Sequence, residues 1–157
     1  MARFELELPT EIMNDIKRIN DNADNIFGGM TKAGAEVVLK NVKSNAPSKI
    51  QHYAKLSKTY KTPSDGGINT KVYFSGYMPF SDGRNAFKRR GRGGGKVYTT
   101  TKGIPADFIA IMYEYGRSNA PFPKKPFFRK SFKKAQIDKA MLDAQKRLSG
   151  GLLEWMS

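Results

Sequence analysis

The chain has 157 residues, no cysteine and a formal net charge of +14. This length fits one ordinary domain with its own core, and the lack of cysteine excludes disulfide frameworks, thiol catalysis and thiolate metal sites. No apolar run approaches the roughly 20 residues of a membrane-spanning helix, and the first residues lack the apolar segment of a signal peptide. We therefore expect a single domain, residues 1–157, in a protein that is soluble, not exported and not in contact with a membrane.

The positive charge is concentrated in the middle of the chain. Residues 1–46 carry six basic and seven acidic side chains, whereas residues 47–137 carry nineteen basic and four acidic ones. Residues 138–157 are balanced, with three of each. The positive electrostatic field of the middle region attracts polyanions or acidic protein surfaces. The alternative is that its scattered lysines simply form a well-solvated surface.

The first 46 residues predict a strand followed by a long helix. Apolar and charged residues alternate over residues 3–8, which is the period of a half-buried strand. Apolar residues then recur at steps of four and three until Pro47 stops the pattern. Because the pattern keeps its phase across Gly28 and Gly29, we expect one continuous helix that buries this stripe. The stripe consists of Ile12, Ile16, Ile19, Ala23, Ile26, Met30, Ala33 and Val37.

The middle of the chain predicts turns, a hairpin and a long loop. Residues 48–67 are polar and turn-rich, with a short helical piece around residues 53–60. Alternation predicts a strand over residues 68–74, and residues 96–101 have the β-branched and aromatic composition of a partner strand. The connection, residues 75–95, is far longer than the usual hairpin loop of about two to five residues.

Six basic residues and no acid lie at the tip of this loop. Arginines among glycines suit contacts with phosphate groups, and such contacts make binding depend on salt. The loop has no Gly-x-x-x-x-Gly-Lys-Ser/Thr motif for a nucleotide, and the lone Phe87 is no platform for stacking bases. The sequence leaves open an arm that contacts DNA or an anionic partner and a merely solvated loop. The basic residues are Arg84, Lys88, Arg89, Arg90, Arg92 and Lys96.

The last third of the chain predicts two helices. A helical count over residues 105–115 groups Phe108, Ile111, Met112 and Tyr115 on one side, which favours a helix over a strand. A second helix is expected from Pro126 to about residue 149, with two apolar stripes that need two partners, one of them a neighbouring subunit. The apolar tail, residues 149–157, docks locally in a monomer or reaches across in an assembly.

Together these elements predict an α+β fold. A small antiparallel sheet packs against one long N-terminal helix and a C-terminal helix, and a long basic loop, residues 75–95, extends from the hairpin.

Residues suited to catalysis are sparse. The single histidine, His52, lies in a lysine-rich segment and is interpreted as solvent-exposed. The acids of the basic middle show no recognisable metal-binding spacing, so we predict no catalytic residue, no cofactor and no metal. A small metal-dependent nuclease that uses Asp82, Asp107 or Glu114 stays an alternative. For Glu114 we prefer an ion pair with Arg117 or with the Arg129/Lys130 cluster, which would fix the orientation of the turn.

Two short motifs resemble those of a known family. They are Tyr113-Glu114-Tyr115-Gly116 and Pro126-Phe127-Phe128-Arg129-Lys130-Ser131-Phe132. These motifs are similar to those of the tail-completion, or head-to-tail joining, proteins of long-tailed bacteriophages of the siphophage type. Their order in the chain is also similar, because they follow a strand, a helix ending in Asn45-Ala46-Pro47, a basic segment and a hairpin. The chain departs from the family at Ser48-Lys49, where members commonly have Thr-Gly, and at Lys130, where a proline is common.

The resemblance implies a small α+β subunit, without enzymatic activity, that forms a ring in the neck of a virion. Six subunits are the expected number, and the expected partners are the portal-side connector, the tail terminator or tail tube, and DNA in the lumen of the ring. A closed ring also pairs open sheet edges without unlimited growth. The alternative from another class is a basic nucleic-acid-binding protein, monomeric or dimeric. The residues assigned to a subunit interface or to fixing the turn are Glu114, Arg117, Phe127, Phe128, Arg129, Phe132 and Trp155.

Overall fold

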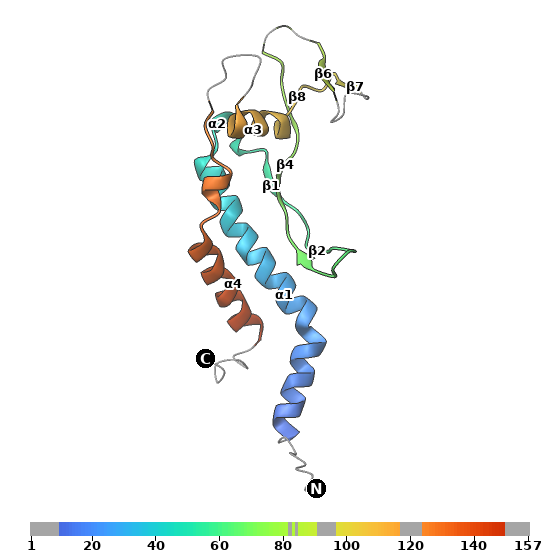
Figure 1. Ribbon diagram of the computed structural model, residues 1–157, viewed down its shortest axis with the longest axis vertical. Coiled ribbons are helices and arrows are strands. Elements are labelled where there is room, and N and C mark those ends of the chain that lie inside the picture. Colours follow the sequence, from blue (N-terminus) through green and yellow to red (C-terminus); the bar gives the residue numbers. More distant parts are fainter. Residues whose placement is uncertain (1–9, 82, 84, 91–96, 117–123, 150–157) are drawn as a thin grey trace, which may run out of the picture. The chain divides into compact units, whose positions relative to one another are not determined.

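Helices and short antiparallel strand pairs follow one another along the chain, so the predicted α+β class is confirmed (Figure 1). This computed structural model describes residues 10–81, 83, 85–90, 97–116 and 124–149, with only the backbone for Asp15, Ile19, Arg89, Arg90 and Tyr98. The strand predicted over residues 3–8 and the tail beyond residue 149, including Trp155, lie outside the described residues. Residues 1–35, 58–70 and 134–157 form one compact unit, and residues 36–57 and 71–133 form another. The expectation of a single domain stays a prediction.

The first unit is built on the N-terminal part of α1 (Thr10–Asn45), which runs unbroken through Gly28 and Gly29 as predicted. It also contains α4 (Lys134–Leu148). A Cβ atom on Gly34 would lie 3.1 Å from side-chain atoms of both Ile137 and Met141. The missing side chain at this position therefore lets α1 and α4 approach closely.

A short hairpin completes this unit. The strands β2 (Tyr60–Lys61) and β3 (Ile68–Asn69) pair antiparallel. The hydroxyl of Thr70 lies 3.1 Å from that of Thr59 and 3.4 Å from that of Thr31, and Lys61 forms an ion pair with Asp24. The hairpin is thus attached to α1.

The predicted apolar stripe of α1 is only partly buried. Ile26 is buried, but the Ile16 side chain is about half exposed. Ile16 is exposed because it precedes Asp24, the residue at which the contacts of α1 with the hairpin and α4 begin. In the second unit, the buried residues of α1 are Val38 and Val42, which lie outside the predicted stripe.

In its described residues, the second unit contains the end of α1, two further helices, three strand pairs and a 3-10 turn. The elements after α1 are α2 (Ser48–Gln51), β1 (Ala54–Leu56), β4 (Val72–Phe74), β5 (Tyr77–Met78), β6 (Phe87–Arg90), β7 (Val97–Thr100), β8 (Ile104–Pro105), α3 (Ala106–Tyr115) and η1 (Arg129–Ser131). The strands β1 and β4 pair with Ala54 opposite Phe74, β5 pairs with β8, and β6 pairs with β7 with Arg90 opposite Val97. 

The strand pairing differs from the prediction. The alternation over residues 68–74 is real, but the segment is divided, since β3 pairs with β2 and β4 pairs with β1. The strand β7 pairs with β6, which lies inside the expected loop of residues 75–95, so part of this loop forms a strand. Residues 91–96 lie outside the described residues. The predicted helical piece at residues 53–60 is wrong, because β1 occupies it.

Two further helix predictions need correction. A helix is present at Ala106–Tyr115, but its buried residues are Ala106, Ala110 and Glu114, while Ile111 and Tyr115 are exposed. The two small alanines allow α3 to lie against β4 and α2. The last helix does not begin at Pro126, because the backbone leaves the helical region at Phe132 (φ −84°, ψ 81°) and α4 starts only at Lys134.

Within the described part of the chain, no helix has the length and apolar character needed to cross a lipid bilayer.

Replacing Gly34 with leucine should force α4 away from α1. We expect the free energy of unfolding to fall by about 1–3 kcal/mol, as for other overpacked positions. The matched control is Gly28→Ala, whose Cβ atom would meet Thr59 at an ordinary 3.6 Å and which should stabilise the helix by up to about 1 kcal/mol. Urea unfolding followed by circular dichroism measures both, and equal effects of the two substitutions would contradict the close contact.

Candidate functional site

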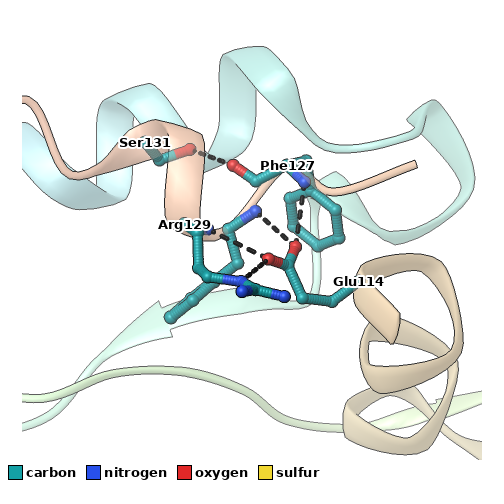
Figure 2. Close-up of polar contacts among 5 residues, drawn as sticks. Glu114, Phe127, Arg129 and Ser131 are labelled. Atoms are coloured by element: carbon teal, nitrogen blue, oxygen red, sulfur yellow. Dashed lines mark hydrogen bonds and ion pairs between the residues drawn. The ribbon is translucent and has the colours of Figure 1, made fainter. Parts of the chain in front are cut away.

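The carboxylate of Glu114 joins the two sequence motifs. It projects from α3, is 4% exposed, and meets the start of the segment Phe127–Arg129 (Figure 2). Its Oε2 atom accepts hydrogen bonds from the backbone N–H groups of Phe127 and Phe128, both at 2.9 Å. Its Oε1 atom accepts one from Nε of Arg129 at 2.9 Å and one from the Arg129 backbone N–H at 3.4 Å. Both carboxylate oxygens are therefore occupied by donors of the second motif.

The surroundings of Glu114 favour its ionised form. Burial alone raises the pKa of a carboxyl group, but the Arg129 side chain and the backbone N–H groups of Phe128, Phe127 and Arg129 outweigh it and lower the pKa of Glu114 below its usual value of 4.5. The ion pair between Glu114 and Arg129 expected from the sequence is confirmed. The alternative partner, Arg117, lies outside the described residues.

A second set of hydrogen bonds holds the other end of the turn. The Ser131 side chain is fully buried, and its hydroxyl donates to the carbonyl of Phe127 at 2.7 Å. From α1, Asn45 Nδ2 donates to Ser131 Oγ and Asn41 Nδ2 donates to the Ser131 carbonyl, both at 3.1 Å. The turn is consequently held between α3 and the last turns of α1.

Aromatic side chains pack around this network. The ring of Phe127 is 3% exposed and lies edge-on to Phe74, with 5.8 Å between ring centroids. Phe128 contacts Phe132 at 5.3 Å. Phe132 itself is about half exposed, so the aromatic cluster begins in the core and ends at the surface.

The outer face of the turn carries a cation and an aromatic ring together. The guanidinium carbon of Arg129 lies 5.1 Å from the centroid of the Tyr115 ring, a distance typical of a cation–π contact. Tyr115 is 62% exposed, and the Arg129 side chain is exposed to the same extent. Tyrosine and arginine are enriched among the residues that dominate protein–protein binding energy. This outward-facing pair suits contact with another protein.

A groove of about 510 Å³ lies beside the turn. Part of its lining is apolar, since Ala46 and Phe127 are buried and the two prolines Pro47 and Pro126 are partly buried. Exposed lysines surround it. We call this the basic groove, and its lining residues are Asn45, Ala46, Pro47, Tyr113, Lys124, Lys125, Pro126, Phe127 and Lys130.

The basic residues predicted to contact DNA or an anionic partner are only partly placed. Lys88 is exposed on β6. The backbones of Arg89 and Arg90 lie on the same strand, paired with β7, so the three residues belong to one hairpin. Arg84, Arg92 and Lys96 lie outside the described residues.

The residues considered for catalysis do not come together in the described part of the chain. There, no group of three or more histidine, cysteine or acidic residues is placed to hold a metal ion. Asp107 is exposed in the first turn of α3, Glu114 is engaged by its hydrogen-bond donors, and Asp82 lies outside the described residues. His52 is exposed, as interpreted, with its ring 4.1 Å from that of Tyr53. 

Sequence reasoning missed the contribution of Asn41, Asn45 and Ser131. It treated Asn45 only as part of a helix stop. No local pattern links residues about 90 positions apart, as Asn41 and Ser131 are, so only the folded chain reveals the contact.

Comparisons with protein-family models, with curated proteins and with solved structures found no match for this chain.

Replacing Glu114 with glutamine should remove an acceptor from a buried group of donors. We expect the variant to be less stable than the wild type by about 1–3 kcal/mol at pH 7. Because the folded-state pKa of Glu114 is lowered, its contribution is complete above pH 4.5 and is lost as the pH falls through the folded-state value.

The stability difference between wild type and Glu114→Gln should therefore shrink as the pH falls below 4.5 in denaturant titrations. The control, Glu36→Gln, changes an exposed glutamate of α1 and should leave stability nearly unchanged at every pH. A difference for Glu114→Gln that does not vary with pH would contradict the ionised, hydrogen-bonded carboxylate.

Proposed function

We propose that this chain is a structural subunit, without enzymatic activity, that assembles with copies of itself into a ring at the head–tail interface of a tailed bacteriophage. There it joins the portal-side connector to the tail terminator or tail tube, and it belongs to the neck of the virion after assembly in the host cytoplasm. One observation carries the proposal. The two motifs that resemble the tail-completion family meet at the Glu114 carboxylate, although twelve residues separate Glu114 from Phe127.

The chemistry of Glu114 supports a structural role for the joined motifs. A carboxylate that accepts hydrogen bonds on both oxygens is committed to holding the turn. The turn that is held in this way fixes Tyr115 and Arg129 at the surface. Side chains that are held rigid before binding lose less conformational entropy when a partner arrives. The site is thus suited to binding another protein surface.

The distribution of apolar residues also supports assembly. Many large apolar side chains remain exposed in both units, and a chain that presents so much apolar surface gains stability by covering it with a partner. In the first unit they are Met13, Ile16, Phe27, Tyr60, Leu142 and Leu148. In the second unit they are Tyr73, Tyr77, Val97, Ile111, Tyr115 and Phe132.

Substituting Tyr115 and Phe132 together with serine should weaken self-association while the fold persists, because both side chains are largely exposed. We expect mass photometry to show fewer ring-sized particles, with or without connector or tail extracts. In a joining assay, heads and tails made without this protein should give about tenfold fewer infectious particles with the variant than with the wild type.

The control is Lys55→Ser, which removes an exposed side chain from β1 that is not among these apolar residues. It should assemble and join normally. Thermal unfolding verifies that each variant is folded. A wild-type chain that never exceeds a dimer, alone or with neck and tail components, and does not restore joining would overturn the proposal.

Replacing Arg84, Arg89, Arg90 and Arg92 with serine tests the role of the arginines predicted to contact DNA or an anionic partner. We expect fewer joined particles, while the free chain binds duplex DNA only weakly at physiological salt. Tight DNA binding by the wild type, with a steep loss between 50 and 200 mM salt that the variant lacks, would favour the alternative of a nucleic-acid-binding protein. Unchanged joining would contradict a role for these arginines in the neck.

A further inference from the structure

We propose that the first turns of α1, residues 10–23, pack against the same segment of neighbouring copies of this chain in a parallel coiled coil. The inference deepens the proposed function and rests on its self-assembly. It commits to one occupant for the exposed part of the apolar stripe of α1, namely the same stripe of a second copy.

This segment of α1 lies open to solvent. Every described side chain from Thr10 to Asn22 is exposed except that of Ile12, which is partly buried. Met13 and Ile16 are each more than half exposed, although both are large and apolar. Most of the stability of a helix in a protein comes from packing of its apolar face. The segment therefore gains stability when a partner covers that face.

The composition of the segment strengthens this argument. Eight of its fourteen residues are asparagine, aspartate or isoleucine, which form helices less readily than alanine, leucine or lysine. Continuity with the packed part of α1 removes the cost of starting a helix, but not the weak propensity of each added residue. Packing has to supply what the propensity lacks.

The spacing of the stripe specifies a helix as the partner. Its residues recur at steps of four and three from Ile12 to Val37, which is a repeat of seven residues over two turns. Such a heptad repeat keeps one seam directed at a partner helix. In heptad notation, Ile16 occupies position a and Ile12 occupies position d, and the rest of the stripe continues these two positions.

The second half of the stripe already packs on a helix. Gly29 and Gly34 flank its members Met30 and Ala33, and side chains of α4 lie against both glycines. The contact at Gly29 is made by Leu148, the last residue of α4. Since α4 ends there, it does not continue along residues 10–23. The first half of the same helix-packing surface is open to a further helix.

The charge of the segment favours a copy of itself over a polyanion or a membrane. Residues 10–23 carry three acidic and two basic side chains, so two such segments repel little and attract DNA little. A helix that lies on a membrane surface instead has a polar face rich in lysine and arginine. An identical helix also matches the repeat in register.

The residue types at the seam favour more than two copies. Isoleucine at positions a and d, as at Ile16, Ile12 and Ile19, shifts coiled coils from two strands to three or more. Met13 and Phe27 occupy position e and are each more than half exposed, so they widen the apolar face beyond the narrow seam of a helix pair. A helix with this wider face can contact one neighbour on each side, and copies arranged in a ring about an axis along the helix all point the same way.

The lack of cysteine allows a test of proximity in the full-length chain. Ile12→Cys introduces a single thiol on the seam, and Asn14→Cys introduces one on the other side of the helix. A short bis-maleimide links thiols across packed helices, whose axes lie about 8–10 Å apart, and we expect at least about fivefold more linked pairs for Ile12→Cys. An antiparallel pair centred on the segment would separate the two residues 12 by about 13 Å along the axis and would not be linked.

The second measurement is the strength of association. Ile12→Ser with Ile16→Ser removes two seam residues and should weaken self-association about tenfold or more in sedimentation velocity, alone or with connector or tail extracts. The control, Asn14→Ser with Arg18→Ser, changes exposed residues of the same turns outside the seam and should leave association unchanged. Thermal unfolding verifies that each variant is folded, and the cross-linking result decides alone if the isoleucine variant is not.

The outcomes separate the two proposals. Preferential linking of Ile12→Cys, in a chain that never exceeds a dimer and does not join heads to tails, supports the helix contact and overturns the ring. Ring-sized particles in which Ile12→Cys is linked no more than Asn14→Cys overturn the helix contact alone. That is also the result expected if residues 150–157 of the same chain, or a different protein, cover the stripe.

Discussion

The second unit depends on one buried charge. Glu114 sits on the buried side of α3, where an ionised carboxylate is costly unless donors surround it. Three backbone N–H groups and the Arg129 side chain supply those donors. The same bonds give partners to N–H groups of a segment that forms only a single 3-10 turn and therefore offers few of its own. Carboxylate and turn thus satisfy each other's hydrogen-bonding groups, and each stabilises the other.

This mutual dependence determines what the surface displays. With the carboxylate inside, Arg129 is held by its Nε atom, and its guanidinium carbon lies over the exposed ring of Tyr115. Ser131, held by Asn41 and Asn45, stops the turn from shifting along α1. Two elements distant in sequence are joined into one surface, bordered by the lysines of the basic groove. The position of that surface follows from internal hydrogen bonds, so it is formed before any partner binds.

The sequence was sufficient where the determining forces are local. The helical period of α1 and the opposite charges of Glu114 and Arg129 were readable in it, and both appear in the structure. The sequence was insufficient where a residue distant along the chain determines the pairing of a strand or the buried face of a helix. Strand β7 could pair with either β4 or β6, and alternation alone does not choose. Likewise, a hydrophobic count placed Ile111 on the buried side of α3, whereas Glu114 occupies it because donors from residues 127–129 make burial of its charge acceptable.

The distribution of charge along the chain constrains how copies of it can contact one another. The first 46 residues carry a net charge of −1, whereas the following 91 carry +15. Two basic regions therefore repel each other, and the field of each attracts an acidic surface. In the proposed assembly, neighbouring copies must meet through surfaces that keep their basic regions apart, and contacts between different surfaces of identical copies close into a ring when the rotation between copies permits.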